Sequence, residues 1–182
     1  IKCRMAGLAP DAVVLVATIR ALKYNGGVAK ENLSTPDMEA LEAGFANLEA
    51  HIEGLQQYGV PIVVTLNSFV TDSEEEIDYV EKRCRAMGCS FALSEVWAKG
   101  GEGGVALAEE LLETMKEKKT QYHPLYPDDM PLEKKIETIA KKIYGADGVT
   151  YAAGVRTKLK KLTEQGYGQC PVCMAKTQYS LS

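Results

Sequence analysis

The sequence predicts an α/β fold with a mainly parallel sheet and alternating helices, and two observations lead to this prediction. Continuous apolar runs rich in β-branched residues, typical of strands buried on both faces, recur along the chain. Between them lie longer segments with apolar residues at helical spacing. Strands that alternate with helices indicate βαβ units with right-handed crossovers, as in Rossmann-like and P-loop-NTPase-like three-layer domains.

The composition narrows the class of protein. The chain has 182 residues and a net charge of −4, so no basic excess points to nucleic acid as a partner. No apolar run approaches the roughly eighteen residues of a membrane helix, and the first residues do not resemble a signal peptide. The five cysteines are irregularly spaced, which suggests reduced thiols in a cytoplasmic protein.

The first strand is predicted over residues 11–19, DAVVLVATI, where apolar residues continue without alternation. Both of its faces are therefore expected to be buried, as in a central parallel strand. The Asn-Gly-Gly string at residues 25–27 indicates a turn or an irregular loop. A helix is then expected with Thr35 as N-cap and Pro36 at its first position. Its apolar stripe consists of Met38, Leu41, Phe45, Leu48, Ile52 and Leu55.

The second strand is predicted over residues 60–66, where the sequence VPIVVTL is again continuously apolar. Capping-box spacing marks the start of the following helix in two frames, Thr71 with Glu74 and Ser73 with Glu76.

The third strand is predicted over residues 91–97, FALSEVW, followed by a glycine-rich loop and a helix from Val105. Residues 1–120 are therefore expected to form one α/β domain. Residues 121–182, which begin with a proline-rich excursion, are expected to form a smaller α/β segment. The elements expected there are helices from Pro131 and over residues 155–165, and strands over residues 148–151 and 173–178.

A binding site is predicted where the three strands end. The carboxyl ends of parallel strands lie at one edge of a sheet, and ligands bind in the crevice beyond it. Phe69 and Trp97, the single tryptophan, are expected to face each other there across a slot that suits a flat ring. The alternative is that both rings cap the core beneath the loops. The polar residues expected at the same edge are Thr18, Arg20, Asn67 and Lys99.

The segment KGGEGG at residues 99–104 resembles an anion-binding loop before a helix N-terminus. It lacks the G-x-x-x-x-G-K-[ST] spacing of a nucleotide P-loop, and that motif occurs nowhere in the sequence. Glu102 would oppose an anion in this loop, and a flexible turn is the alternative interpretation.

Cys170 and Cys173 have the C-x-x-C spacing of a redox pair or of half a zinc site. The partner half of a zinc site is missing, so two packed thiols are expected instead. No pair of carboxylates suggests acid–base catalysis and no serine lies in a nucleophile elbow, so the catalytic residues stay unassigned.

Four stretches together resemble the formate–tetrahydrofolate ligase family, also called formyltetrahydrofolate synthetases. They follow one another in the family's order and cover essentially the whole chain. The stretches are residues 16–27 (VATIRALKYNGG), 67–72 (NSFVTD), 97–103 (WAKGGEG) and 171–182 (PVCMAKTQYSLS).

The resemblance implies synthesis of 10-formyltetrahydrofolate from formate, ATP and tetrahydrofolate through formyl phosphate. It also implies a cytoplasmic enzyme that needs Mg²⁺, is helped by a monovalent cation and forms a homotetramer. The pterin ring would lie between Phe69 and Trp97, near Leu93. Candidate contacts for formyl phosphate or the glutamate tail are Arg20, Lys23, Asn67, Lys99, Gly100 and Gly101.

One departure from the family pattern matters. The family's P-loop, with the cations that hold the phosphates, lies upstream of anything in this sequence. The chain is therefore expected to be a folate-side fragment, inactive alone, whose first strand has lost neighbours from the remainder of the enzyme. The alternatives are a non-catalytic Rossmann-like interaction module, and a redox or zinc module built on Cys170 and Cys173.

Overall fold

The computed structural model describes residues 1–175, and their contacts divide the chain into two compact units. One unit is Pro10–Tyr122. The other joins Ile1–Ala9 to the chain from His123 onward. The first unit ends close to the expected boundary at residue 120, whereas the first nine residues group with the C-terminal segment.

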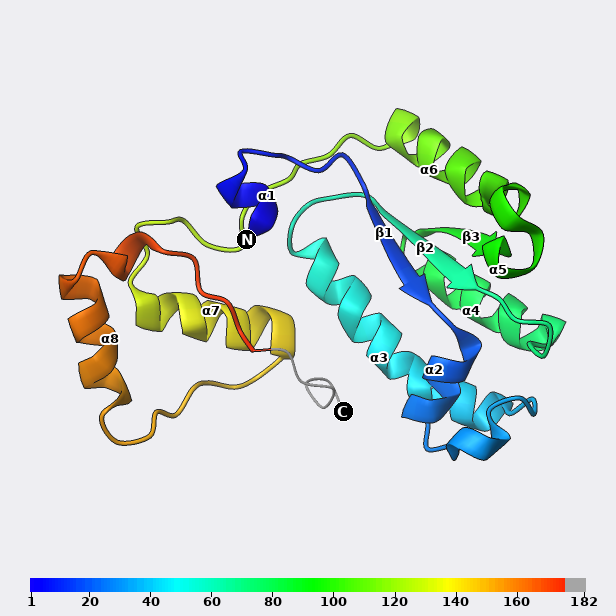
Figure 1. The fold of residues 1–182 in the computed structure, drawn as a ribbon, viewed down its shortest axis with the longest axis horizontal. Helices are drawn as coiled ribbons and strands as arrows, with labels where there is room; N and C mark the ends of the chain where they lie inside the picture. Colours follow the sequence, from blue (N-terminus) through cyan, green and yellow to red (C-terminus); the bar gives the residue numbers. More distant parts are fainter. Residues whose placement is uncertain (176–182) are drawn as a thin grey trace. The chain divides into compact units, whose positions relative to one another are not determined.

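A three-stranded, all-parallel sheet lies at the centre of the first unit (Figure 1). Its strands are β1 (Val13–Ala17), β2 (Ile62–Asn67) and β3 (Ser90–Ser94), in the spatial order β1-β2-β3. Val13 pairs with Ile62, and Val63 pairs with Ser90. The α/β class predicted from the apolar runs is confirmed.

Helices cover both faces of this sheet, which makes three layers (Figure 1). Helices α3 (Met38–Gln56) and α4 (Glu74–Ala86) lie on one face, and α6 (Val105–Glu117) lies on the other. The principal core lies between the sheet and the first two helices. Its fully buried members include Leu41, Ile52, Val64, Leu66, Val80 and Cys84.

The first strand is the point where the burial prediction fails. Within residues 1–175 it is an edge strand, paired only with β2, and α6 packs over β3 and β2 instead. Val14 and Val16, on the α6 side of the sheet, are therefore 38% and 62% exposed. Leu15, which points to the other face, packs against the core.

A short helix follows β1 where the sequence suggested only a turn. Helix α2 (Ile19–Asn25) begins after Thr18, whose hydroxyl accepts the Ala21 N–H at 3.0 Å. It packs so closely on α3 that a Cβ added at Gly26 would lie 1.9 Å from the Ala40 carbonyl oxygen. A 3₁₀ turn (Lys30–Asn32) precedes α3.

The boundaries of two helices differ from the prediction or decide between its alternatives. The N-cap of α3 is Asp37, which accepts the Ala40 N–H at 2.9 Å, and Thr35 and Pro36 lie in the preceding loop. For α4, Ser73 and Glu76 form the capping box, so the second of the two predicted frames is correct.

The third strand stops earlier than predicted. It ends at Ser94, and the chain turns at once into α5 (Val96–Lys99), which carries Trp97. The glycine-rich segment is a 3₁₀ helix (Gly100–Gly104) that leads into α6. Here the Gly103 carbonyl accepts the Glu95 N–H at 2.9 Å, and this bond closes the turn directly behind the strand.

The second unit contains α1 (Lys2–Met5), α7 (Leu132–Tyr144), α8 (Val155–Glu164) and a 3₁₀ turn (Tyr167–Gln169). The strand expected over residues 148–151 is not formed, because no strand of this unit's described residues is there to pair with it. Of the strand expected over residues 173–178, the first three residues are irregular and the others lie outside the described residues.

Candidate functional site

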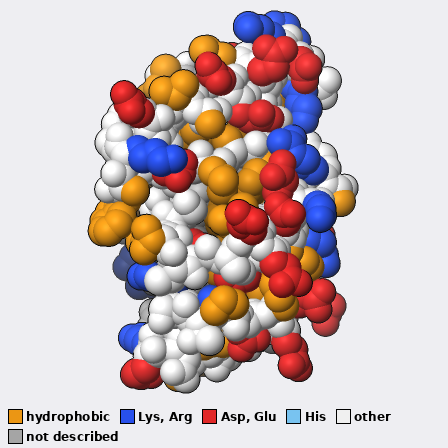
Figure 2. Space-filling view, turned by 90° about the vertical axis from the view of Figure 1, so that its right-hand side faces the viewer, with side chains coloured by type: hydrophobic (Ala, Val, Ile, Leu, Met, Phe, Trp, Pro, Cys, Tyr) orange, Lys and Arg blue, Asp and Glu red, His pale blue; other side chains and the backbone are white. Residues whose placement is uncertain are grey.

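The predicted aromatic residues lie at the edge where the strands end. Phe69 is in the loop after β2, and Trp97 is in α5 just after β3. Figure 2 looks onto this side of the molecule and shows apolar side chains near its middle, bordered by charged ones. The large apolar side chains exposed by these loops are Val70, Val96 and Trp97.

Phe69 and Trp97 come together as an aromatic pair. Their ring centroids are 6.3 Å apart and their planes are tilted by 48°. Phe69 is half-buried, whereas Trp97 is 72% exposed. The pair is therefore anchored on the Phe69 side, and Trp97 is the more exposed partner.

The space between the two rings is too narrow for a third ring in this conformation. A flat ligand stacked on both would need about 7 Å between them, since each stacked layer requires about 3.5 Å. The observed 6.3 Å is instead the spacing of two rings in direct contact. Entry of a flat ligand thus requires Trp97 to shift, which its exposure on the four-residue α5 permits.

Arg20, from α2, supports Phe69. Its guanidinium carbon lies 4.2 Å from the centroid of the Phe69 ring, so it covers one ring face. Its Nη2 donates to the Thr71 hydroxyl at 3.2 Å. The Nε of Arg20 is buried and has no hydrogen-bond partner among the residues that the structure describes.

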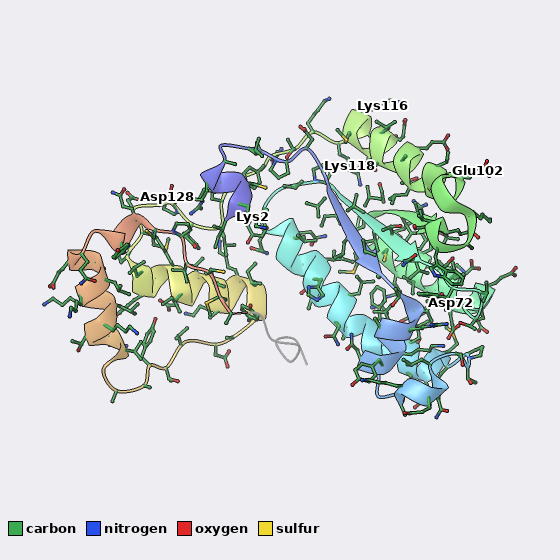
Figure 3. All side chains as sticks on the ribbon, viewed as in Figure 1. Lys2, Asp72, Glu102, Lys116, Lys118 and Asp128 are labelled. Atoms are coloured by element: carbon green, nitrogen blue, oxygen red, sulfur yellow. The ribbon has the colours of Figure 1, made fainter. Side chains whose placement is uncertain are left out.

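Asp72 holds the main chain of Phe69. Its Oδ2 accepts the Phe69 N–H at 2.9 Å, and its own N–H donates to the Phe69 carbonyl at 2.9 Å. Its Oδ1 is buried and accepts no hydrogen bond from any group of residues 1–175. Burial raises the pKa of Asp72 above its ordinary value, although the bond from Phe69 opposes this shift. Figure 3 shows Asp72 at the end of the sheet where β1 runs into α2.

Leu93 and Asn67, two further predicted site residues, end neighbouring strands. Leu93 is half-buried on β3, in register with Leu66, and packs against the core. Asn67 is half-buried at the end of β2, in register with Ser94. Both lie at the same sheet edge as the aromatic pair.

Lys23 is placed differently from the anion contact suggested by the sequence. Its ammonium is fully buried and lies 2.9 Å from Glu76 Oε1. It also donates to the Thr35 carbonyl at 2.8 Å, while the Asp37 N–H donates to the same Glu76 oxygen. The Lys23 ammonium is therefore enclosed by protein groups and has no exposed surface to offer an anionic ligand.

Glu76 is held in its charged form by these contacts. Burial alone would raise its pKa, but hydrogen bonds from the Ser73 N–H, the Lys23 ammonium and the Asp37 N–H outweigh burial. The pKa of Glu76 is lowered as a result, and the pair joins α2, α3 and α4 beneath the site.

The glycine-rich segment is more compact than an open anion loop. The Lys99 ammonium pairs with Glu95 at 2.7 Å on the surface. Gly100 and Gly101 are exposed, whereas a Cβ added at Gly103 would lie 2.4 Å from the Glu95 backbone. Packing explains the glycine at position 103, and the exposed residues remain open to a ligand.

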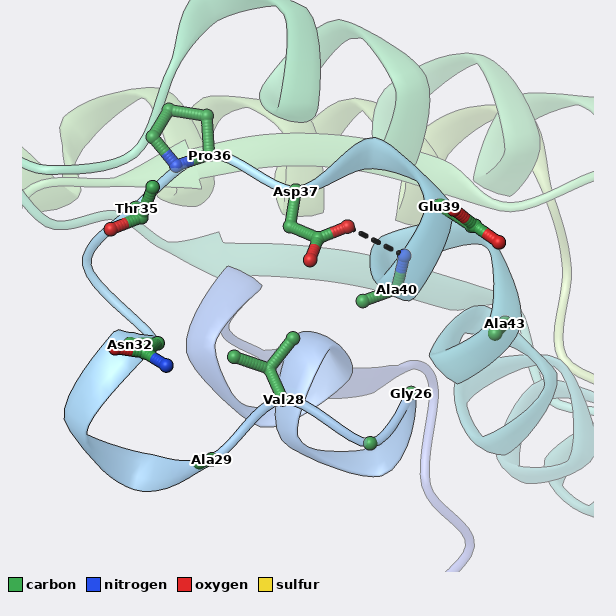
Figure 4. A pocket seen from close by; sticks show the side chains of 11 residues that line it. Gly26, Val28, Ala29, Asn32, Thr35, Pro36, Asp37, Glu39, Ala40 and Ala43 are labelled. Carbon is green, nitrogen blue, oxygen red and sulfur yellow. Dashed lines mark hydrogen bonds between the residues drawn. The ribbon is translucent and has the colours of Figure 1, made fainter.

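A pocket of about 700 Å³ lies between the end of α2 and the start of α3, and shares no lining residue with the aromatic pair (Figure 4). Figure 4 shows Asp37 and Val28 pointing toward each other across it. The Asp37 carboxylate caps α3 through Ala40, so its local role is to start the helix.

Cys170 and Cys173 are exposed free thiols, so the expectation that they are packed is wrong. The segment between them is held to the second unit by two other residues. Lys135, fully buried, donates to the Gly168 and Cys170 carbonyls at 3.0 Å each, and Tyr126 accepts the Val172 N–H at 2.9 Å. Among residues 1–175, no group of three His, Cys, Asp or Glu side chains is arranged to hold a metal ion.

The comparison with known families decides the identity of the chain. A model of formate–tetrahydrofolate ligase matches residues 1–182, its entire length. The chain belongs to the formate–tetrahydrofolate ligase family. The ligase resemblance carried by the four sequence stretches is thereby confirmed, and with it a role in tetrahydrofolate one-carbon metabolism. No helix within residues 1–175 has both the length and the apolar character needed to cross a membrane.

The ligase sequence also contains site residues that pattern reasoning missed. Asp72 and Thr71 fix Phe69 and Arg20, and Glu76 neutralises Lys23. A weak signal for Asp72 was present, because aspartate side chains readily form hydrogen bonds with main-chain groups a few residues away. No comparable signal pairs Lys23 with Glu76, which lie far apart in the sequence.

Proposed function

We propose that this chain supplies the folate side of an ATP-dependent formate–tetrahydrofolate ligase. Phe69 and Trp97 would hold the pterin ring between them, with Leu93 alongside. The observation that supports this most directly is the aromatic pair at the strand ends, with one anchored ring and one exposed ring. Stacking on two rings would add about 0.5–1.5 kcal/mol per contact beyond the burial of area.

The proposed reaction has two steps. ATP phosphorylates formate to formyl phosphate, and the folate N10 then attacks the formyl carbon, from which inorganic phosphate departs. The residues of this chain would orient N10 by fixing the ring. Lys99 would leave Glu95 to meet formyl phosphate or the glutamate tail, since cations favour anionic reactants, and Asn67, Gly100 and Gly101 would lie alongside.

ATP and Mg²⁺ are assigned to other residues in this proposal. The sequence has no P-loop motif, the glycine-rich loop that cradles nucleotide phosphates in many ATP-binding domains. We propose that the remainder of the enzyme binds both. A monovalent cation, a homotetramer and a cytoplasmic location are further proposals that rest on the family alone.

Binding of folate can be tested with the single tryptophan as the reporter. Titration of the chain with folic acid is expected to quench Trp97 fluorescence saturably, because a ring stacked on the indole alters its emission. Phe69→Ala should abolish saturation, and Val70→Ala, an exposed change in the same loop, should not. Absence of quenching up to the solubility limit of folic acid would contradict the proposed site.

An activity assay tests the proposal that this chain binds folate while other residues bind ATP and Mg²⁺. The isolated chain, mixed with formate, Mg-ATP and tetrahydrofolate, is expected to form no 10-formyltetrahydrofolate. Turnover on the order of 1 s⁻¹ or faster, the usual enzymatic range, would show that the chain carries its own nucleotide site.

A non-catalytic interaction module is the second candidate, and the exposed edge strand favours it. Val14 and Val16 present apolar surface beside an unpaired strand edge, which is a ready template for another chain. The folate titration separates the candidates, because an interaction module has no reason to bind the ring.

A further inference from the structure

The turn that ends α4 brings two cysteines together. The Cys89 N–H donates to the Cys84 carbonyl at 3.1 Å, and the Gly88 N–H donates to the Arg85 carbonyl at 2.9 Å. Gly88, with a φ of +80°, is the left-handed residue that reverses the chain. The two hydrogen bonds and the left-handed glycine define a Schellman motif, a common ending of α-helices.

Cys84 and Cys89 occupy the two positions of this motif whose side chains meet. The third residue from the helix end and the second residue beyond the cap often make an apolar contact there. Cys84 is 0% exposed and Cys89 is 5% exposed, and both belong to the core cluster between the sheet and helices α3 and α4. A thiolate at Cys89 would raise the pKa of Cys84 by its charge, so the two sulfurs are neighbours within this core.

The separation of the two main-chain segments suits a disulfide. Hydrogen-bonded residues on adjacent main-chain segments have Cα atoms about 5–6 Å apart, as in an antiparallel pair of strands. Disulfides join cysteines whose Cα atoms are roughly 4.4–6.8 Å apart and whose side chains point to the same side. Cys84 and Cys89 meet the first condition through their main-chain bond and the second through their burial in one cluster.

We propose that Cys84 and Cys89 form a redox site, in which a disulfide joins the end of α4 to the start of β3. The reaction is exchange with a small disulfide such as oxidised glutathione. Each thiol gives up its proton as the Sγ–Sγ bond forms, and the two electrons reduce the small disulfide to two thiols. The inference is independent of the folate site, since these cysteines lie at the start of β3 and the aromatic pair lies beyond its end.

Burial determines how fast this site exchanges. Neither thiol forms the reactive thiolate while the turn stays closed, because burial raises the pKa of both cysteines. Exchange therefore passes through opening of the turn and is slow. At equilibrium the folded chain should still favour the bond, because it holds the two sulfurs together, whereas the unfolded chain must first bring them into contact.

The test uses a variant in which the exposed cysteines are replaced by serine, so that this pair alone can form an intramolecular bond. The substitutions are Cys3→Ser, Cys170→Ser and Cys173→Ser. The variant is equilibrated with defined mixtures of reduced and oxidised glutathione, in buffer and in urea. Mass spectrometry after acid quenching then counts the disulfide, and gives its equilibrium constant of formation in the folded and in the unfolded chain.

The equilibrium constant should be about tenfold or more larger in the folded chain than in the unfolded chain. By linkage, the oxidised variant should also unfold at a higher urea concentration than the reduced one. The matched control combines Cys84→Ala with Arg85→Cys in the same serine background. Position 85 is exposed, so folding does not place its side chain against Cys89, and the ratio of the two constants should be near one or below.

Three results would overturn the inference. A ratio near or below one in the serine variant would mean that the fold does not hold the two sulfurs in bonding geometry. An equal ratio in the control would mean that sequence proximity alone explains the bond. Glutathione adducts on Cys84 and Cys89, without a bond between them, would show that the two thiols respond to oxidised glutathione separately.

Discussion

Lys23 and Glu76 form a fully buried ion pair, and residues of this kind have the largest individual effects on stability. Lys23→Met should destabilise the chain by about 3–5 kcal/mol, because Glu76 is left buried without its charge partner. Urea unfolding monitored by circular dichroism measures the loss.

The same experiment has an internal control and a clear contrary result. Lys82→Met, which removes an exposed partner of Asp78, should change the free energy of unfolding by well under about 1 kcal/mol. The double variant Lys23→Met, Glu76→Gln should recover part of the loss, since no buried charge remains. Equal stabilities of the Lys23 and Lys82 variants would contradict a structural role for the buried pair.

The lowered pKa of Glu76 predicts how stability depends on pH. The folded protein holds the ionised form more strongly than the unfolded chain does, so Glu76 contributes stability above its ordinary pKa of 4.5. This contribution should be lost as the pH falls from there through the lowered, folded pKa. Glu76→Gln should therefore flatten the acid limb of a stability–pH profile, and an unchanged limb would argue against the assignment.

The five cysteines are predicted to differ in reactivity. Burial raises the pKa of Cys84 to about 12 and also raises that of Cys89, so neither forms the reactive thiolate in the folded protein. Cys3, Cys170 and Cys173 are exposed. Alkylation of the native chain with iodoacetamide, followed by mass spectrometry, should label these three and spare the buried two until urea is added.

At the scale of elements, α2 and α3 meet backbone to backbone, and two glycines make this contact possible. A Cβ at Gly26 would lie 1.9 Å from the Ala40 oxygen, and one at Gly44 would lie 1.8 Å from the Leu22 oxygen. Neither neighbour can retreat, because both are main-chain atoms of helices.

Gly44→Ala is therefore expected to destabilise the chain by about 1–3 kcal/mol or more, as overpacking does. Gly101→Ala is the matched control, because a Cβ at Gly101 meets nothing within 4 Å and its φ is not positive. Thermal unfolding should separate the two variants by several degrees. Equal midpoints would mean that the two helices can move apart at little cost.

The sequence predicted some elements better than others, for physical reasons. The continuous apolar run at residues 60–66 fixes β2, because a central parallel strand needs apolar residues on both faces. Helix α2 escaped prediction, although Thr18 offered a cap, because the helix is short and the Asn-Gly-Gly that ends it reads as a loop. The burial of β1 was overestimated, because an apolar run in the sequence does not show whether a second strand or a helix covers the strand on each side.

For the candidate site, the sequence pattern predicted where the two aromatic residues lie, but it did not predict the polar side chains that hold them in place. Phe69 and Trp97 could be predicted because strand-end positions in a parallel sheet share an edge. The roles of Asp72 and Lys23 depend on which atoms meet after folding. A lysine in the string RALKYN looks like a surface cation until the position of Glu76 is known.

At the scale of the whole molecule, the exposed edge of β1 predicts self-association. Val16→Lys places a charge on this edge and should lower concentration-dependent association, measured by analytical ultracentrifugation. Val70→Lys, an equally drastic change at an exposed loop position, should leave association unchanged. Association that is insensitive to both variants would locate the contact elsewhere.

The register of the sheet also sets an order of events during folding. Val13 pairs with Ile62, so β1 can join β2 only after the chain that forms α2 and α3 has closed into a long loop, whereas β2 and β3 are connected by α4 alone. Contacts of such wide separation form slowly. During synthesis on a ribosome, β1 is made well before β2. The apolar segment VVLVA of β1 is therefore exposed to solvent until β2 is available to pair with it. Until β2 is made, this apolar segment is exposed surface of the kind that promotes aggregation.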